Sequence, residues 1–159
     1  MGFWHNVFGI YGGSGATVVA TPQSLPEDFI DFLLASTNIT SRVATRVHQA
    51  MMPEPSRFPA IWFAISGKDR GFSRTHDGGT TDTLARYTFD VEYLSTGLDS
   101  AQDLGDAADD LLDGYRGTFG NRSVQAVFIS DQDDEYVPRG TGGDFGIHVV
   151  AQRITIITT

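Results

Sequence analysis

The sequence predicts one α+β domain in which two helices pack on a mostly antiparallel or mixed sheet of about four to five strands. Three observations support this fold class. Residues 98–116 have the apolar spacing of an amphipathic helix, residues 85–93 alternate strictly between apolar and polar side chains, and residues 60–66 are almost continuously apolar. At 159 residues the chain is long enough to bury the core of a single domain.

The composition excludes several classes of function. Twenty acidic and eleven basic residues give a net charge of −9, and Lys68 is the only lysine, so the chain lacks the basic surface of ordinary nucleic-acid-binding proteins. The absence of cysteine excludes disulfides, thiolate catalysis and cysteine metal sites. The first basic residue is Arg42, and no apolar run approaches the ~18 residues of a membrane span, so we expect a soluble protein with no membrane partner.

Residues 1–23 form a segment of their own, and residues 24–159 form the predicted domain. Four glycines between positions 9 and 15 match neither a P-loop nor a nucleophile elbow, which favours a hinge. We therefore expect a flexible or partner-ordered arm, with one short β-prone run at 17–21. Its aromatic side chains Phe3, Trp4 and Phe8 are candidate anchors on a neighbouring molecule, because such side chains fill interface pockets well.

The first helix of the domain is predicted to begin after Ser24, with Pro26 and Glu27 in its first turn, and to fade at residues 36–38. Weak alternation predicts a strand at 42–49. The next strand, 60–66, is apolar at both alternating sets of positions, which is typical of a strand covered on both faces.

Residues 67–84 are predicted to form a long polar loop, and loops of this length in a compact domain are usually functional or disordered. It contains a small basic cluster, Lys68, Arg70 and Arg74, and the pair His76–Asp77. We interpret this loop as a candidate contact with another subunit, in which arginines pair with carboxylates; simple flexibility is the alternative. A catalytic His–Asp pair is disfavoured there because the surrounding glycines, serine and threonines give it no rigid support.

Carboxylates dominate the rest of the chain. The alternating strand 85–93 directs Asp90 and Glu92 away from the core. The helix at 98–116 carries an acidic stripe on the face opposite its apolar residues, and this stripe consists of Asp99, Asp103, Asp106, Asp110 and Asp113. Like charges three or four residues apart cost roughly 0.2–0.5 kcal/mol per pair, so the stripe does not serve helix stability. It is either a solvated face or a surface that functions by being negative.

A strand at 124–130 is followed by an acidic, glycine-rich excursion over 131–143 and by a final strand at 145–157. The excursion contains Asp131, Asp133, Asp134 and Glu135, but it lacks the sixth-position glycine and twelfth-position glutamate of a calcium-binding EF-hand loop. No nucleophile, acid–base pair, cofactor motif or metal-ligand spacing is present elsewhere. We therefore predict a protein that is not an enzyme and needs no cofactor or metal.

The order of elements resembles the tail-terminator proteins of long-tailed bacteriophages, also called tail-completion or tail-to-head joining proteins. Four features carry the resemblance over roughly two thirds of the chain. They are a short strand followed by the segment Phe58-Pro59-Ala60-Ile61-Trp62-Phe63, the arginine-led strand 86–93, the helix 101–112 ending at Asp113-Gly114-Tyr115, and a strand, acidic loop and long final strand that closes at 147–156.

The resemblance implies a hexameric ring at the head–tail junction of a virion, assembled in the host cytoplasm. Such a ring ends the tail tube, docks the connector or head-completion protein, and lets DNA pass through its lumen without specific binding. A sheet lining the lumen would place Asp90, Glu92 and the acidic loop there, while the position of the helix stripe stays open. The alternatives are a head-completion (stopper) or tail-tube protein, or a small α+β ligand-binding domain or enzyme that uses the glycine-rich loop or His76.

Overall fold

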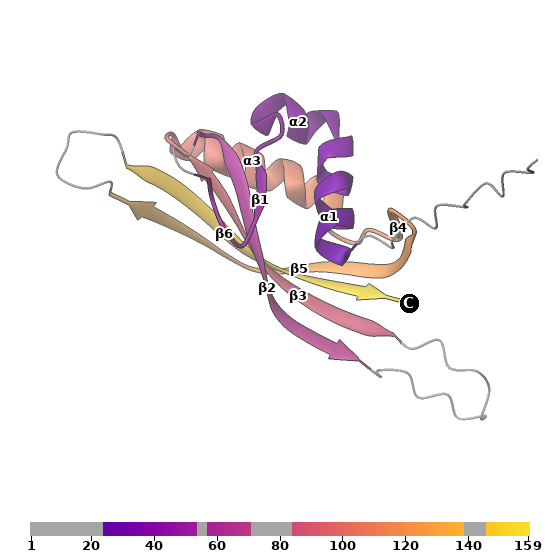
Figure 1. Cartoon of the computed structure of the whole chain (residues 1–159). Coiled ribbons are helices and arrows are strands. Elements are labelled where there is room, and N and C mark those ends of the chain that lie inside the picture. Colours follow the sequence, from indigo (N-terminus) through magenta and orange to yellow (C-terminus); the bar gives the residue numbers. More distant parts are fainter. Residues whose placement is uncertain (1–23, 54–56, 71–83, 139–145) are drawn as a thin grey trace, which may run out of the picture.

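The computed structural model describes residues 24–53, 57–70, 84–138 and 146–159. Within these ranges, three helices lie on one side of a six-stranded sheet (Figure 1). The helices are α1 (Leu25–Ala35), α2 (Thr37–Val43) and α3 (Leu98–Leu112). The strands are β1 (Val47–Gln49), β2 (Ala60–Arg70), β3 (Ala85–Ser95), β4 (Gly117–Phe119), β5 (Arg122–Val137) and β6 (Ile147–Thr158).

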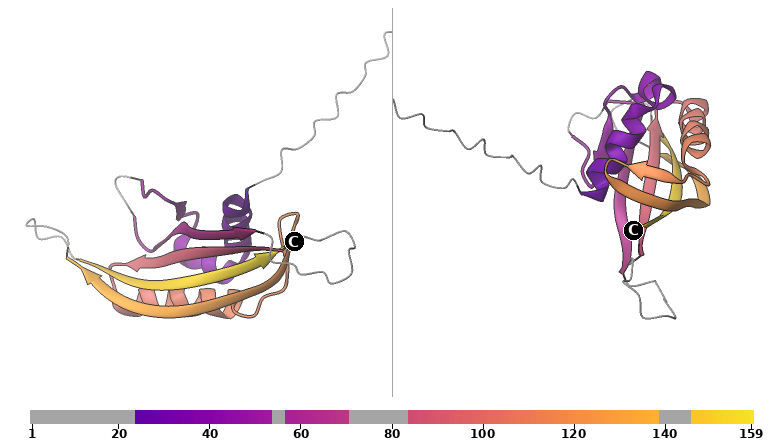
Figure 2. Two further views of the ribbon diagram at one scale, coloured as in Figure 1. Left: turned by 90° about the horizontal axis from the view of Figure 1, so that it is seen from below. Right: turned by 90° about the vertical axis from the view of Figure 1, so that its right-hand side faces the viewer.

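The sheet is mixed, with the strand order β1-β2-β3-β6-β5-β4. β1 runs parallel to β2, and every other neighbouring pair is antiparallel. One hairpin consists of β2 and β3, another of β5 and β6, and the two join along β3 and β6. Because Ala85 pairs with Thr158 whereas Ser95 pairs with His148, the two hairpin tips lie at opposite ends of the curled sheet (Figures 1 and 2).

The core lies between the sheet and the helices, and Phe29 of α1 is at its centre. Its ring is fully buried and lies 5.2 Å from the ring of Phe63, 5.1 Å from that of Phe89 and 6.0 Å from that of Phe119. Edge-to-face packing of this kind suits the charge distribution of aromatic rings. One helix side chain therefore ties together β2, β3 and β4.

The start of α1 follows the predicted signal. Ser24 donates its backbone N–H and its hydroxyl to Glu27 Oε2 at 2.8 and 3.0 Å, and Pro26 occupies the first turn, where a backbone N–H is not needed. The hydrogen bond from the Ser24 backbone lowers the pKa of Glu27, and the bond from the Ser24 hydroxyl adds to this effect.

The apolar face of α3 is buried as predicted, and its residues Ala101, Leu104, Ala108 and Leu112 are fully inaccessible. Gly105 allows α3 to lie close to the sheet, because a Cβ at this position would lie 3.3 Å from Val150 Cγ1. The helix ends at Leu112 and not at Arg116 as predicted. Its N-terminal cap position is Gly97.

One local prediction is wrong between residues 36 and 49. The chain forms a second helix, α2, where the sequence predicted a fading helix and then a strand, and only Val47–Gln49 is extended. Ile39 and Val43, four residues apart, are both fully buried by this helix. Burial at helical spacing therefore overrides the weak strand alternation. Ala44, with φ of 53°, then ends the helix.

Two predicted loops are partly strand. β2 continues to Arg70 and β5 continues to Val137, so the predicted loops at 67–84 and 131–143 begin later than expected. Lys68 pairs with Tyr87, and Glu135 pairs with Val149, which shows that backbone pairing extends beyond the apolar residues. Pairing across the sheet decides strand length here more than side-chain polarity does.

The α+β class is as predicted, although the described part of the chain contains three helices and six strands against the two and four to five expected. The prediction that 60–66 is covered on both faces is wrong. Ile61 and Phe63 are fully buried against the helices, whereas Trp62 and Ala64 on the other face are only half-buried. Phe128, in the strand predicted at 124–130, is 53% exposed. The sheet has one covered face and one open face.

Candidate functional site

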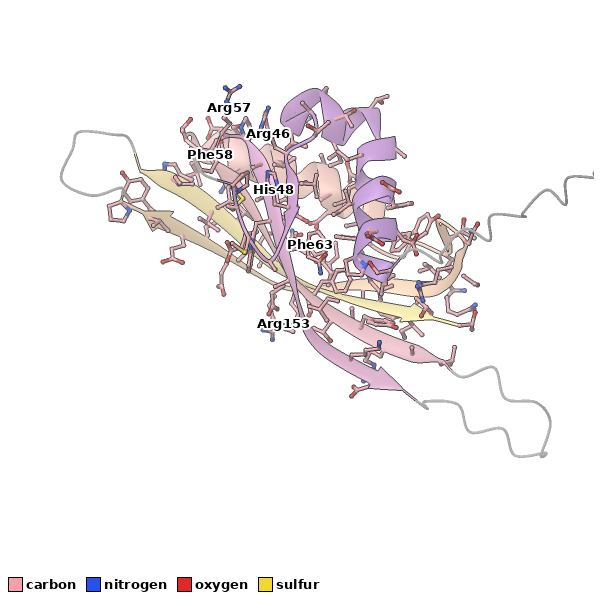
Figure 3. All side chains as sticks on the ribbon, in the orientation of Figure 1. Arg46, His48, Arg57, Phe58, Phe63 and Arg153 are labelled. Atoms are coloured by element: carbon pink, nitrogen blue, oxygen red, sulfur yellow. The ribbon has the colours of Figure 1, made fainter. Side chains whose placement is uncertain are left out.

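The candidate site is the open face of the sheet, which we define as the face opposite the helices. Alternation along β3 buries Val91 and Tyr93 and leaves Asp90 and Glu92 on the open face. The register then places Asp90 beside Arg153 and Glu92 beside Ala151. Arg153 projects from the side of the sheet that the helices do not cover (Figure 3). The left view of Figure 2 looks toward this face, with the helices behind the strands.

A hollow of about 400 Å³ lies on the open face across β3, β6 and β5. Its lining combines four carboxylates with one guanidinium. The lining residues are Asp90, Val91, Glu92, Asp131, Asp133, Ala151, Gln152 and Arg153. The small side chain of Ala151 at the middle strand leaves the space between the acidic residues of β3 and those of β5. The structure therefore brings together residues that the sequence assigned to two separate segments.

A bulge in β5 brings the acidic segment of this strand to the open face. Asp131 has a positive φ of 56°, and the pairing with β6 shifts by one residue between Ser130 and Gln132. One extra residue exchanges the faces of all later side chains. Asp133 therefore pairs beside Ala151 on the open face, whereas Asp134 points to the helix side and accepts a hydrogen bond of 2.9 Å from Gln102 Nε2 of α3.

Arg153 links three strands across this face. Its Nε lies 3.0 Å from Asp90 Oδ1, and its NH1 lies 3.8 Å from Asp131 Oδ2. The hydrogen bond and the charge of Asp90 raise the pKa of Arg153. All three side chains are substantially exposed, so water screens both ion pairs and they contribute little to stability. One cation among four carboxylates leaves the hollow negative.

Glu92 is a carboxylate of the open face whose charged form is disfavoured by its surroundings. Partial burial raises its pKa, and the nearby charges of Glu135 and Asp90 raise it further. These causes all disfavour the charged form. Asp90 and Glu135 are thus each close enough to Glu92 to repel its charge, although Glu135 belongs to the opposite hairpin. An arrangement that costs stability is consistent with a surface selected for its charge.

The helix side of the sheet carries a smaller polar cluster beneath α3. Gln152 Nε2 donates to Asp109 Oδ1 at 2.9 Å and to Gln132 Oε1 at 3.2 Å. The Tyr93 hydroxyl and Gln152 Oε1 are buried without a hydrogen-bond partner in the described ranges. Burial raises the pKa of Tyr93 and, together with neighbouring aspartates, that of Asp109. This cluster fixes α3 on the sheet by polar contacts as well as by packing.

The acidic stripe of α3 does not join the open face. Its residues Asp99, Asp103, Asp106, Asp110 and Asp113 are exposed on the outer side of the helix, away from the sheet. The molecule therefore has two separate acidic surfaces, the open face and the α3 stripe. The sequence analysis placed the stripe on the helix face opposite the apolar residues, and it left open which acidic surface would face a lumen.

The remaining predicted site residues fall partly outside the described ranges. Lys68 lies on β2, with its Nζ 5.1 Å from the centre of the Tyr87 ring, which is a cation–π contact within one subunit. Arg70 is the last residue of β2. The predicted interface residues Arg74, His76 and Asp77 and the predicted anchors Phe3, Trp4 and Phe8 lie outside the described residues.

Sequence reasoning missed Arg153 and Asp109. Arg153 is the only lysine or arginine of β6, and an isolated charge in an otherwise uncharged strand was the available signal. Asp109 is next to the apolar face of α3, between Ala108 and Asp110, so its position at the boundary of the two faces could have been noted. Its hydrogen-bond partner Gln152 could not have been identified from the sequence, because 43 residues separate the two.

Among the described residues, no three histidine or acidic side chains are grouped so that they could hold a metal ion. In the same ranges, no helix has both the length and the apolar composition that crossing a membrane would require.

The geometry thus defines a class of protein, an α+β domain with helices on one face of a curled sheet and an acidic open face on the other. A solved structure shares this fold. It is a chain in the virion of a native gene transfer agent particle, which matches with a TM-score of 0.62 over 85% of this chain and 94% of that chain. The two are 14% identical in sequence, so the likeness establishes a common fold. No protein-family model and no curated protein matches the sequence.

Proposed function

We propose that this chain is a structural virion protein that assembles into a hexameric ring at the head–tail junction, ends the tail tube and docks the head connector. The observation that carries the proposal is the fold, shared over nearly the whole of both chains with a chain of a gene transfer agent virion. The order of sequence elements, which resembles tail-terminator proteins, supports the finer assignment.

In the proposed ring the open face lines the lumen. Asp90, Glu92, Asp133 and Glu135 would face the DNA, and symmetry would repeat them around the channel. Rows of carboxylates beside a low-dielectric wall produce a negative potential that repels phosphate. DNA would therefore pass without sticking. The single cation at the hollow, Arg153, is held by Asp90 and Asp131 and leaves the surface negative.

The helices and the α3 stripe would then face outward. Lys68 and Arg70 belong to the last residues of β2, and Arg74, His76 and Asp77 follow them in the sequence. In the proposal these residues contact the tail tube or the next subunit through pairs between arginine and carboxylate. No enzymatic activity is assigned.

Measuring the mass of the purified full-length protein in solution tests whether it assembles into a hexameric ring. Native mass spectrometry and light scattering should give six times the chain mass of 17.3 kDa, and electron microscopy should show closed rings. A protein that remains monomeric at high concentration, alone and with tail tubes, contradicts the proposal. Localisation in assembled particles separates the terminator from the alternatives, because a stopper would lie one layer nearer the head and a tube protein would repeat along the tail.

DNA threading tests which face lines the lumen. The double variant Glu92→Lys with Asp133→Lys reverses two charges on the open face, and Asp103→Lys with Asp106→Lys makes the same change in net charge on the α3 stripe. Added lysines bind phosphate strongly at low salt. Open-face variant rings should retain linear duplex DNA but not closed circular DNA, because only a free end can enter the lumen. The stripe variant should bind both forms alike. The opposite result would place α3 in the lumen.

A further inference from the structure

The outer edge of β5 is only partly covered. β4 pairs with Arg122–Val124, and the backbone of Val127 exchanges hydrogen bonds with Gly114 and Tyr115. β4 itself is protected, because the Tyr115 hydroxyl bonds to the N–H and C=O of Thr118. Beyond the bulge at Asp131, the segment Gln132–Val137 pairs with β6 on one side and has no backbone partner on its other side in the described ranges. We call this segment the free edge.

A regular edge of six residues is a template for another strand unless something covers or blocks it. The free edge carries Asp133, Asp134 and Glu135, which are all exposed. Two copies of it paired together would place carboxylates opposite one another, which destabilises a sheet. The charges therefore exclude self-pairing of free edges and select a strand that carries no negative charge.

The chain contains a segment that fits this requirement. Residues 1–23 include no aspartate, glutamate, lysine or arginine, and residues 17–21 read Thr-Val-Val-Ala-Thr, which favours a strand. Tyr136 and Val137 at the end of the free edge are 54% and 41% exposed and point to opposite faces, so an added strand with β-branched side chains would find apolar contacts on both.

The outer edge of β2 is less suitable as the partner. β2 is paired with β1 only at Ile61–Phe63, which leaves its outer edge from Ala64 to Arg70 without a partner strand in the described part of the chain. Its pairing with β3 shifts between Ile65 and Gly67, and a bulge of this kind bends a strand and interrupts regular pairing. Asp69 stands between Lys68 and Arg70, so charge does not disfavour this edge, and the bulge alone makes it the poorer template.

The free edge is out of reach of residues 17–21 of the same copy. Arg122 Nε lies 3.5 Å from Asp28 Oδ2, so α1 begins at the Arg122 end of β5. Gln132 lies ten residues further along the strand, about 33 Å away at 3.3 Å per residue. The four residue steps from Thr21 to Leu25 span at most about 14 Å. The strand that reaches the free edge must come from another molecule.

We propose that residues 17–21 of one subunit add as a strand to the free edge of its neighbour and thereby link the subunits of the assembly. This inference deepens the proposed function and rests on it, because it requires a neighbouring copy. Backbone hydrogen bonds supply the affinity in such strand addition, and side-chain contacts supply the selectivity.

Disulfide trapping tests the proposal in the full-length protein, which has no native cysteine. Protein with Val19→Cys is mixed with protein carrying Asp134→Cys or Glu135→Cys. The side chains at positions 134 and 135 point to opposite faces of the sheet. One of the two therefore lies on the same face as residue 19, whichever face the added strand directs that residue toward. Oxidation should give a disulfide-linked dimer with one of them, because cross-strand Cβ atoms are close enough for a disulfide. Ser66→Cys on β2 replaces Val19→Cys as the control and should give little dimer.

Two results would overturn the inference. One is efficient crosslinking from Ser66→Cys with none from Val19→Cys, which would assign the free edge to β2 of the neighbour. The other is the absence of any crosslink in fully assembled protein. A ring without the Val19 crosslink refutes this inference and leaves the proposed function intact. A Val19 crosslink in open chains that never close refutes the ring and leaves the strand addition intact.

A proline variant gives a second measurement. Val19→Pro removes an N–H from the added strand and should weaken assembly at least tenfold, whereas Asn6→Pro, outside the β-prone run, should leave assembly unchanged. Equal assembly of the two variants would contradict the inference. Both substitutions precede Ser24, where the described structure begins, and the inference expects the same thermal unfolding in both proteins.

Discussion

Replacement of Glu92 by Gln should make the unassembled subunit more stable to unfolding at neutral pH. The substitution keeps the shape of the side chain and removes a charge that is partly buried and repelled by Glu135 and Asp90. Like charges on neighbouring strands cost about 0.2–1 kcal/mol per pair, and exposure to solvent reduces this. With two such neighbours, we expect a gain of about 0.5–1 kcal/mol in the free energy of unfolding.

The pH dependence of this gain follows from the direction of the shift. The pKa of Glu92 is raised in the folded state above its ordinary value of 4.5. Below that value the carboxyl is protonated in both states, so wild type and variant should be equally stable. As the pH rises through the folded pKa, the folded wild type carries the unfavourable charge and loses stability relative to the variant. The difference should therefore appear between acidic and neutral pH.

Urea unfolding followed by circular dichroism, at pH 4 and pH 7 and at low protein concentration, measures both effects. High salt should reduce the gain at pH 7, because partly exposed charges are screened. Asp103→Asn on the α3 stripe is the control for a general loss of negative charge. The reasoning is refuted if Glu92→Gln is less stable than wild type at pH 7, or if the difference is the same at both pH values.

Three further predictions concern the core, the polar cluster and a turn. Phe29→Ala should lower the free energy of unfolding by about 3–5 kcal/mol, whereas Phe128→Ala should change it by less than about 0.5 kcal/mol; equal effects in urea unfolding would contradict the assigned core. Asp109→Asn should stabilise by about 0.5 kcal/mol at pH 7 and not at pH 3, because its raised pKa disfavours the charge. Gly120→Ala should lower the free energy of unfolding by about 1–2 kcal/mol, because φ is +55° at this position and the added methyl would meet Asp28. Thermal unfolding should show this as a lower melting temperature.

The helices α1 and α3 and the strand β3 could be predicted because their signals are local. In α3 the spacing of Leu104, Ala108 and Leu112 repeats with the helical period, and each of these residues is buried. In β3 the alternation of Asp90 and Glu92 with buried neighbours is equally regular. In a helix or strand with one buried face, apolar residues recur in the sequence with the period of that element.

The candidate site could be predicted only in part. Asp90, Glu92, Asp131 and Asp133 were recognised as acidic surface residues, but their meeting in one hollow depends on the register of β3, β6 and β5. The bulge at Asp131 then decides that Asp133 shares the open face and that Asp134 does not. A register shift has no local signature here, since Asp131 is one of several acidic residues in the segment.

The sequence by itself determined the α+β class, the two amphipathic elements and the negative charge, because periodicity and composition are properties of neighbouring residues. Tertiary structure decided which strands are adjacent, how far β2 and β5 extend, and which face stays open. Those features depend on hydrogen bonds between residues far apart in the chain, as between Arg153 and Asp90, which are separated by 63 positions. No local pattern specifies such a pairing, because its free energy arises only when the strands meet.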